Sequence, residues 1–169
     1  MQFRLSVPAD FPSVMRIIRS AQERLKELGA DQWQNNYPNE HTLEADFQNQ
    51  TGYVAQEGAE IIGYCSLSFQ PDKDYLHITG GNWQSDKPYG VIHRLAVQAR
   101  AHGTGAAAAL AEFAAQTART RGVHYLRADT HEDNLPMRRF LAKHGFIYRG
   151  IVYLDGKRKR LAFEKKLPA

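Results

Sequence analysis

The chain has 169 residues, 43% hydrophobic and 24% charged, with a formal net charge of +4 and an isoelectric point near 9.2. That is the size and composition of one soluble globular domain, and the lone cysteine, Cys65, excludes an internal disulfide framework and suits a reducing compartment. No stretch approaches the roughly 18 apolar residues of a membrane span, and no leader pattern opens the chain, so we expect a cytoplasmic protein.

The first part of the chain alternates between strand and helix patterns. Alternation over residues 2–7 predicts a short strand. Apolar residues at three- and four-residue steps predict a long helix over residues 10–29, with its apolar stripe in the core. We also predict a short helix over residues 41–48 and a β-hairpin from residues 53–57 and 61–69.

Two loops of this part are unusual. Residues 31–38 are polar but contain Trp33 and Tyr37, which either plug the core from outside or line the pocket of an amine substrate, since aromatic faces attract cations. Residues 70–89 form a long connection, and loops of that length in a compact domain are usually functional or mobile. A short strand over residues 75–78 is the alternative within that loop.

A strand, a glycine turn and a helix follow one another in the middle of the chain. Residues 91–97 are rich in Val, Ile and Leu and predict a buried strand, while residues 106–118 are strong helix formers. Between them, Gly103 and Gly105 allow a sharp turn and a close approach of the backbone to a ligand. The first amides of a helix lack acceptors within the helix, so this arrangement favours binding of phosphate or pyrophosphate.

The last part of the chain returns to strand, helix and hairpin. Residues 123–130 predict a strand, and Asp133 or Asn134 then caps a helix. A closing hairpin over residues 146–166 is predicted by the turn dipeptide Asp155-Gly156. The order of all these elements is typical of an α/β fold with a mixed sheet.

The glycine turn carries a specific spacing. Leu95 and Val97 end the predicted central strand, and the segment His102-Gly-Thr-Gly-Ala-Ala107 begins five residues beyond Val97. This resembles motif A of the GCN5-related N-acetyltransferases (GNAT), a Q/R-x-x-G-x-G/A pattern after a strand ending in L-x-V. His102 stands where that family usually has Gln or Arg. A register beginning at Arg100 restores the basic residue but leaves the spacing two residues short, so we prefer the register with His102.

A second segment supports the resemblance. The residues from Asn134 to Phe146 look like motif B of the same family, in which Asn and a final Gly-Phe stand at this separation. The resemblance covers essentially the whole chain. It implies the GNAT acyl-CoA N-acyltransferase fold, an α/β architecture with a central mixed, mostly antiparallel sheet flanked by helices, as a single domain over residues 1–169.

The resemblance implies acetyl-CoA as co-substrate, in a cleft where the central strand splays away from the strand over residues 123–130. The backbone of Leu95, Ala96 and Val97 would bind the pantetheine arm. The side chain of Asn134 would lie near that arm, and helix capping is its alternative role. The pyrophosphate would be held by backbone amides of Gly103, Thr104, Gly105, Ala106 and Ala107.

His102 has several alternative roles at this turn. Its side chain would lend charge to the phosphates only when protonated, and an unperturbed histidine is mostly neutral at pH 7. Arg100 is the alternative source of positive charge, and His102 then contributes its amide alone.

The groups that move protons are less evident from the sequence. Where some relatives carry a glutamate on the central strand this chain has Val91, and His93, on the same face, is the candidate base, with a structural role as the alternative. Where many relatives carry a tyrosine acid this chain has Leu141. Tyr153 is the candidate acid and Tyr148 its alternative. The CoA thiolate can also leave without an acid if the pKa of its thiol is near the usual value of about 8.5.

These observations predict an acetyl-CoA-dependent N-acetyltransferase acting on a primary amine of a small molecule or peptide. A non-catalytic acyl-CoA-binding module or sensor is the alternative, because of the missing tyrosine and the presence of His102. The histidines are scattered and imply no metal. The positive charge suits a phosphorylated co-substrate, and without a basic stripe interleaved with aromatics we expect no nucleic-acid partner and no membrane. A homodimer is left open.

Overall fold

The computed structural model describes residues 1–168. The chain divides into two compact units, the first formed by residues 1–67 and 92–114 and the second by residues 68–91 and the chain from Ala115 onward. The strand and helix that flank the glycine turn each contribute residues to both units. The single domain expected from the sequence therefore stays a prediction.

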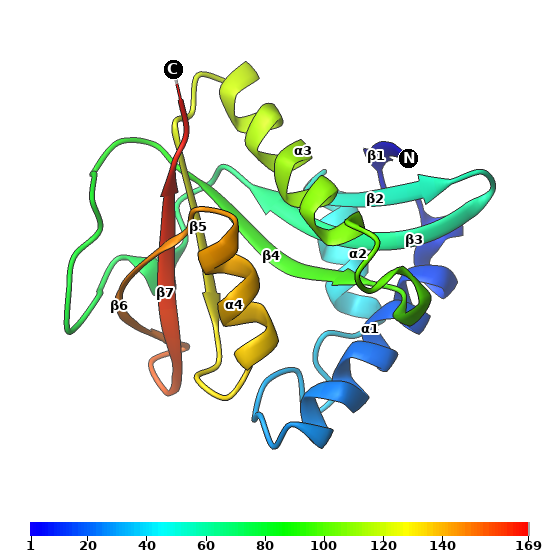
Figure 1. Ribbon diagram of the computed structural model, residues 1–169, viewed down its shortest axis with the longest axis horizontal. Coiled ribbons are helices and arrows are strands. Elements are labelled where there is room, and N and C mark those ends of the chain that lie inside the picture. Colours follow the sequence, from blue (N-terminus) through cyan, green and yellow to red (C-terminus); the bar gives the residue numbers. More distant parts are fainter. Residues whose placement is uncertain (169) are drawn as a thin grey trace. The chain divides into compact units, whose positions relative to one another are not determined.

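The first unit contains most of the amino-terminal elements (Figure 1). Its helices and strands, with 3-10 turns at Pro8–Asp10 and Ala99–Ala101, are β1 (Gln2–Leu5), α1 (Phe11–Glu27), α2 (Glu40–Gln48), β2 (Gly52–Glu57), β3 (Glu60–Ser68), and the larger parts of β4 (Gly90–Val97) and α3 (Ala106–Thr120). The helices and strands, but not the two 3-10 turns, agree with the sequence prediction to within a few residues at each boundary.

An apolar cluster forms one side of the first unit. The helix α1 ends before Gly29, whose φ of 73° is the left-handed conformation of a helix C-terminus. The buried face of α1 packs with α2 and the strands; the cluster contains Val14, Met15, Ile17, Ile18, Leu43, Val54, Ile61, Tyr64 and Ala96. Full burial of such aliphatic side chains stabilises by about 1.5–3 kcal/mol each.

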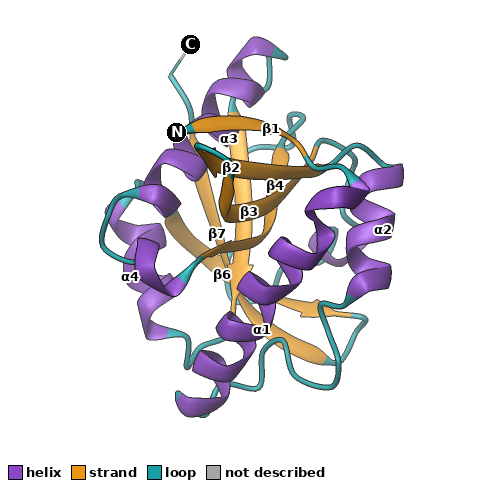
Figure 2. Ribbon diagram, turned by 90° about the vertical axis from the view of Figure 1, so that its right-hand side faces the viewer, coloured by secondary structure: helices purple, strands orange, loops and turns teal. Residues whose placement is uncertain are grey.

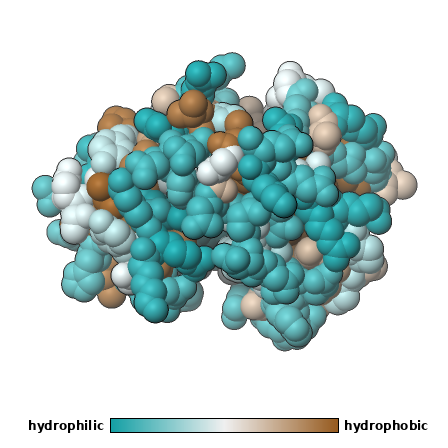
Figure 3. Space-filling view, turned by 90° about the horizontal axis from the view of Figure 1, so that it is seen from below, coloured by the Kyte–Doolittle hydropathy of each residue, from teal (hydrophilic) through white to brown (hydrophobic). Residues whose placement is uncertain are grey.

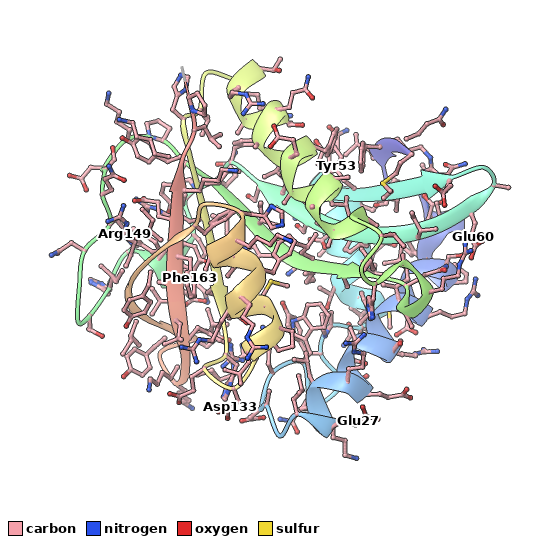
Figure 4. All side chains as sticks on the ribbon, viewed as in Figure 1. Glu27, Tyr53, Glu60, Asp133, Arg149 and Phe163 are labelled. Carbon is pink, nitrogen blue, oxygen red and sulfur yellow. The ribbon has the colours of Figure 1, made fainter. Side chains whose placement is uncertain are left out.

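The helix α3 packs on the other face of these strands. Phe113 of α3 stacks on Phe3 of β1 and meets Tyr53 of β2 edge to face. Tyr53 and the core residue Val54 are consecutive, so their side chains point to opposite faces of the sheet. Figure 2 shows α1 and α2 on one side of β2 and β3 and α3 on the other, and Figure 4 shows Tyr53 beside α3.

The second unit contains the carboxy-terminal elements. They are a 3-10 turn at Lys73–Tyr75, β5 (Tyr125–Thr130), α4 (Leu135–Lys143), β6 (Ile147–Leu154) and β7 (Arg158–Lys166). The predicted turn between β6 and β7 is confirmed, since Asp155 and Gly156 have φ of 50° and 69° as a two-residue hairpin requires. Figure 1 shows β5, β7 and β6 side by side.

The long loop over residues 70–89 is packed into the second unit. Tyr75 is buried and accepts a hydrogen bond from Trp83 Nε1 at its carbonyl, and Thr79 pairs with Ile151 of β6. The backbone amide of Gln84 donates to the buried carboxylate of Glu164 at 2.8 Å. The strand considered over residues 75–78 is wrong; the end of a 3-10 turn takes its place, because the chain turns here to bury Tyr75.

The buried carboxylate of Glu164 on β7 links several segments of the second unit. Its partners are Arg127, at 2.9 Å from Nε, and Arg149, at 3.6 Å from Nε. The guanidinium of Arg127 also lies over the rings of Trp83 and Tyr89, at 4.1 and 3.8 Å. Figure 4 labels Arg149 and, on the neighbouring strand, Phe163.

The predicted fold class is confirmed. The strand order is β1-β2-β3-β4-β5-β7-β6; the pair β4–β5 is parallel, while β1–β2, β2–β3, β5–β7 and β6–β7 are antiparallel. No helix within residues 1–168 combines the length and apolar character needed to span a bilayer. The face drawn in Figure 3 is mostly hydrophilic, with hydrophobic residues in small groups.

Candidate acyl-CoA site

The end of β4 is fixed along β3 before the chain turns. The backbone amide of Gln98 donates to the Ile62 carbonyl at 2.8 Å, and its side-chain amide donates to the Ile61 carbonyl at 2.7 Å. Consecutive residues of a strand direct their backbone groups to opposite edges, so those of Val97 point away from β3. This is the edge that an extended ligand would need.

The glycine turn has the conformation that its sequence predicts. Gly103 and Gly105 have φ of 78° and 90°, and an added Cβ would meet open space at both positions. A side chain at either position is therefore disfavoured by backbone strain alone, by about 1–2 kcal/mol for each residue. The two glycines turn the backbone from the end of β4 into α3.

The first amides of α3 face out of the helix. The amide of Ala109 donates to the Gly105 carbonyl at 2.9 Å, so those of Ala106, Ala107 and Ala108 precede the first intrahelical bond. Ala106 is buried, whereas residues 102–105 are exposed. Amides in this position, together with the helix dipole, form a site for an anion.

A glycine of β3 brings α3 close to β4. A Cβ at Gly63 would lie 2.8 Å from Leu110 Cδ1 and 3.1 Å from Val97 Cγ1. Leu110, which the sequence places where the helix first returns to the core, is fully buried. The missing side chain of Gly63 thus lets the helix start and the strand end pack against one point of the sheet.

The imidazole of His102 is held neutral at the turn. Its ring nitrogens contact Nη1 of Arg24, from the last turn of α1. Burial and the neighbouring Arg24 charge lower the pKa of His102 below its ordinary value, although a hydrogen bond to the Val97 carbonyl opposes this. Arg24, rather than the imidazole, therefore supplies the positive charge beside the turn.

Arg100 is engaged elsewhere. Its guanidinium pairs with Glu60 at the end of the β2–β3 hairpin, labelled in Figure 4, and its Nε donates to Gln98 Oε1 at 2.8 Å. This pairing makes Arg100 the less favourable source of positive charge for a ligand at the turn.

The candidate base His93 is half-buried on β4 and is followed by an unusual residue. Arg94 has φ of 55°, a left-handed conformation inside a strand. Such a residue breaks the alternation of side chains and re-aims its neighbours, as β-bulges do beside active sites. Of the residues that follow it, Ala96 belongs to the apolar cluster, and Leu95 and Val97 are half-buried.

Arg94 is bound to a buried carboxylate. Asp46 of α2 accepts hydrogen bonds from Arg94 Nε at 3.0 Å and Nη2 at 2.5 Å. It also accepts from the Tyr64 hydroxyl at 2.6 Å and from Ser66 at 3.2 Å. Burial lowers the pKa of Arg94, but the Asp46 carboxylate outweighs this and raises it above its ordinary value. Removing one partner of such a buried pair costs about 3–5 kcal/mol.

The two aromatic residues of the loop over residues 31–38 differ in their surroundings. Trp33 is half-buried and packs against the apolar cluster, as the plug alternative predicts. Tyr37 is 36% exposed, and its hydroxyl accepts a hydrogen bond from Arg94 Nη1 at 3.1 Å. Only Tyr37 therefore combines exposure with a polar contact to β4.

The second unit contains the remaining predicted residues. Asn134 is buried and caps α4, since its Oδ1 accepts from the Met137 amide at 3.2 Å. Tyr153 and Tyr148 lie on β6 and are 42% and 48% exposed. Leu141, at the position where the family resemblance leads us to expect a tyrosine, is buried in the unit.

Cys65 carries no chemistry at ordinary pH. The side chain is fully buried on β3, and burial raises the pKa of its thiol to about 12. The thiol therefore stays protonated, and a protonated, buried thiol is inert as a nucleophile.

Sequence reasoning missed Arg24, Asp46 and Arg94. Two of them had a signal: Asp46 stands three residues after Leu43, on the core-facing side of a helix, and Arg94 interrupts an apolar strand. A charge in either place needs a partner. Arg24 had none, because it lies on the polar side of α1.

The comparisons with known proteins agree on one family. A sequence model of the acetyltransferase (GNAT) family matches residues 16–146. A GNAT-family acetyltransferase structure from Streptococcus agalactiae is 31% identical, with a TM-score of 0.87, over 99% of this chain and 96% of that one. No curated protein sequence matches the chain.

More distant structures share the fold. A GNAT-family acetyltransferase from Listeria monocytogenes is 19% identical with a TM-score of 0.74, over 98% of this chain and 94% of that one. An N-acetylglutamate synthase from Neisseria gonorrhoeae, complexed with coenzyme A and N-acetyl-glutamate, is 17% identical with a TM-score of 0.70, over 99% of this chain and 35% of that one.

Proposed function

Because the chain belongs to the acetyltransferase (GNAT) family, we propose that it transfers the acetyl group of acetyl-CoA to a primary amine of a small molecule or peptide. The observation that carries the proposal is the glycine turn between β4 and α3. Its two left-handed glycines and the first amides of α3 support the proposal, because free amides at a helix start can bind a phosphate or pyrophosphate.

The residues of the first unit fit acetyl-CoA. The pyrophosphate would be held by the amides of Gly103, Thr104, Gly105, Ala106 and Ala107, with that of His102 at the edge of the turn. The backbone of Leu95, Ala96 and Val97 is the candidate for holding the pantetheine arm, and the groups of Val97, which point away from β3, support it. The charge would come from Arg24, since His102 is neutral. Asn134 of the second unit stays a candidate for the same ligand.

Acetyl-CoA supplies an activated acyl group: the amine nitrogen bonds to the carbonyl carbon as the carbon–sulfur bond breaks, and CoA leaves as the thiol. The amine must first lose a proton. For a lysine amine of pKa about 10.4 this costs about 4.6 kcal/mol at pH 7, whereas an α-amine of pKa about 7.7 to 8.0 costs about 1 to 1.4 kcal/mol. A strand without a carboxylate base therefore favours the α-amine.

His93 is the residue that we assign to the amine's proton. It lies on β4, four residues before Val97, and imidazole is the side chain that most often serves as a general base. Tyr153 is the candidate donor of a proton to the leaving thiolate. Tyr37 would contact the acceptor, and Trp33 of the same loop packs against the apolar cluster beneath it.

The test is release of the CoA thiol from acetyl-CoA in the presence of amino acids, free-amino-terminal peptides, lysine peptides, polyamines and aminoglycosides. Turnover confined to one class establishes the enzyme and its acceptor. His93→Gln is expected to lower kcat at least tenfold without changing acetyl-CoA affinity, because it removes only the proton acceptor. A panel with no turnover above hydrolysis, despite tight acetyl-CoA binding, would point to the sensor instead.

A further inference from the structure

The cluster around Asp46 joins three segments of the first unit. The carboxylate comes from α2, Tyr64 and Ser66 come from β3, and Arg94 comes from β4. Asp46 is 5% exposed and Tyr64 1% exposed, so these bonds form away from water. With both carboxylate oxygens accepting hydrogen bonds, the charge is compensated in place.

This pairing fixes the orientation of the Arg94 guanidinium. Nε and Nη2 both donate to Asp46, in the side-on geometry that only arginine offers. The backbone at this residue is left-handed, and a non-glycine residue keeps that conformation where its surroundings determine it. The third nitrogen, Nη1, then has one direction left, toward the Tyr37 hydroxyl at 3.1 Å.

The loop that carries Tyr37 is fixed as well. The side chain of Gln22 on α1 donates to the Pro38 carbonyl at 3.0 Å, and Gln34 donates to the Gln22 carbonyl at 3.1 Å. Arg94 therefore meets a loop whose backbone is already held against α1. The phenol ring remains partly exposed while its hydroxyl is tied to the residue next to His93 in β4.

We propose that Arg94 is a positioning residue for the amine acceptor: oriented by Asp46, it holds the Tyr37 hydroxyl where the acceptor binds. Because Asp46 compensates its charge, Arg94 acts by orienting Tyr37 rather than by attracting the acceptor. A hydroxyl that accepts a hydrogen bond from a cation is strengthened as a donor, so Tyr37 suits a carbonyl, hydroxyl or second amine of the acceptor. This proposal rests on the proposed function.

The experiment compares Tyr37→Phe, Arg94→Lys and the double variant with the wild-type enzyme, using as probe the panel amine with the highest wild-type kcat/KM. Loss of one hydrogen bond is expected to raise the acceptor KM about three- to tenfold in Tyr37→Phe, with kcat and acetyl-CoA affinity unchanged. Arg94→Lys keeps the positive charge but loses the paired Nε and Nη2 donors, so it should raise the acceptor KM by a similar factor. The double variant should be no worse than Arg94→Lys.

The matched control is Arg19→Lys. Arg19 of α1 pairs with Glu40 of α2 at 2.7 Å, but both side chains are about 60% exposed, and this variant should change no constant. An unchanged acceptor KM in Tyr37→Phe, or effects of the two single changes that multiply in the double variant, overturns the proposal. So does a lower unfolding temperature in Arg94→Lys with an unchanged KM. If the wild-type enzyme acetylates no amine, the proposed function fails, and this inference with it.

Discussion

Arg24 and Arg100 flank the same turn but have different partners. Arg24 contacts the neutral His102 ring, whereas Arg100 pairs with Glu60 and bonds Gln98. Among the ion pairs of the described residues, Arg24 has no carboxylate partner, so its charge can act on an anion bound at the glycine turn. The charge of Arg100 is already compensated by Glu60.

Arg24→Gln is accordingly expected to weaken acetyl-CoA binding about three- to tenfold at low salt, and less as salt screens the exposed charge. Titration calorimetry at two salt concentrations measures both effects. Arg100→Gln is the control and should stay within about twofold of wild type. If the two variants weaken binding equally, Arg24 has no special part at the turn.

At the scale of elements, the start of α1 is held by one carboxylate. Asp10 accepts from Arg4 at 2.7 and 2.9 Å and from the Val7 amide at 2.9 Å, which ties β1 to the first turn of the helix. The hydrogen bonds from Arg4 lower the pKa of Asp10, against the opposing effect of burial. A lowered carboxyl pKa stabilises the fold at any pH above the unfolded value of about 3.9.

That stabilisation should disappear as the pH falls from about 4 through the lower folded pKa. Urea unfolding between pH 6 and pH 2 is expected to show a steeper loss of stability for the wild type than for Asp10→Asn, whose side chain does not titrate. Arg4→Met should reproduce the shallower slope. Acid limbs of equal steepness in all three proteins would mean that the pair does not couple to folding.

The helices and strands were predictable because their signals are local. The hairpin turn at Asp155-Gly156 requires two residues in the left-handed conformation, and both residues adopt it. The spacing from Val97 to the glycines marked the strand, turn and helix from the sequence alone. The loop over residues 70–89 was not predictable in the same way, because it folds through distant contacts, such as Gln84 with Glu164, 80 residues apart.

The candidate site divides in the same manner. Its backbone amides follow from local conformation, so the glycine turn could be located in advance. The contacts of Arg94 with Asp46 and of Arg24 with His102 join residues 48 and 78 positions apart. Such pairs depend on how α1 and α2 pack on the sheet, which no local pattern encodes.

At the scale of the whole molecule, the two family motifs belong to different compact units. The glycine turn lies in the first unit and Asn134 in the second, while β4 and α3 contribute residues to both. The family match extends from residue 16 to residue 146 and so includes parts of each. The proposal for acetyl-CoA depends mainly on the first unit, where the turn and Arg24 are in place.

The measurement that tests this account most directly is acetyl-CoA binding, by titration calorimetry, to the wild type, Gly103→Ala and Gly58→Ala. Gly58, in the β2–β3 turn, has φ of 59° and open space around a Cβ, so both substitutions should cost a similar stability of about 1 kcal/mol. Only Gly103→Ala re-aims amides of the turn, and it should weaken binding at least tenfold while Gly58→Ala leaves it unchanged. No binding to the wild type, or equal affinity in both variants, would contradict the account.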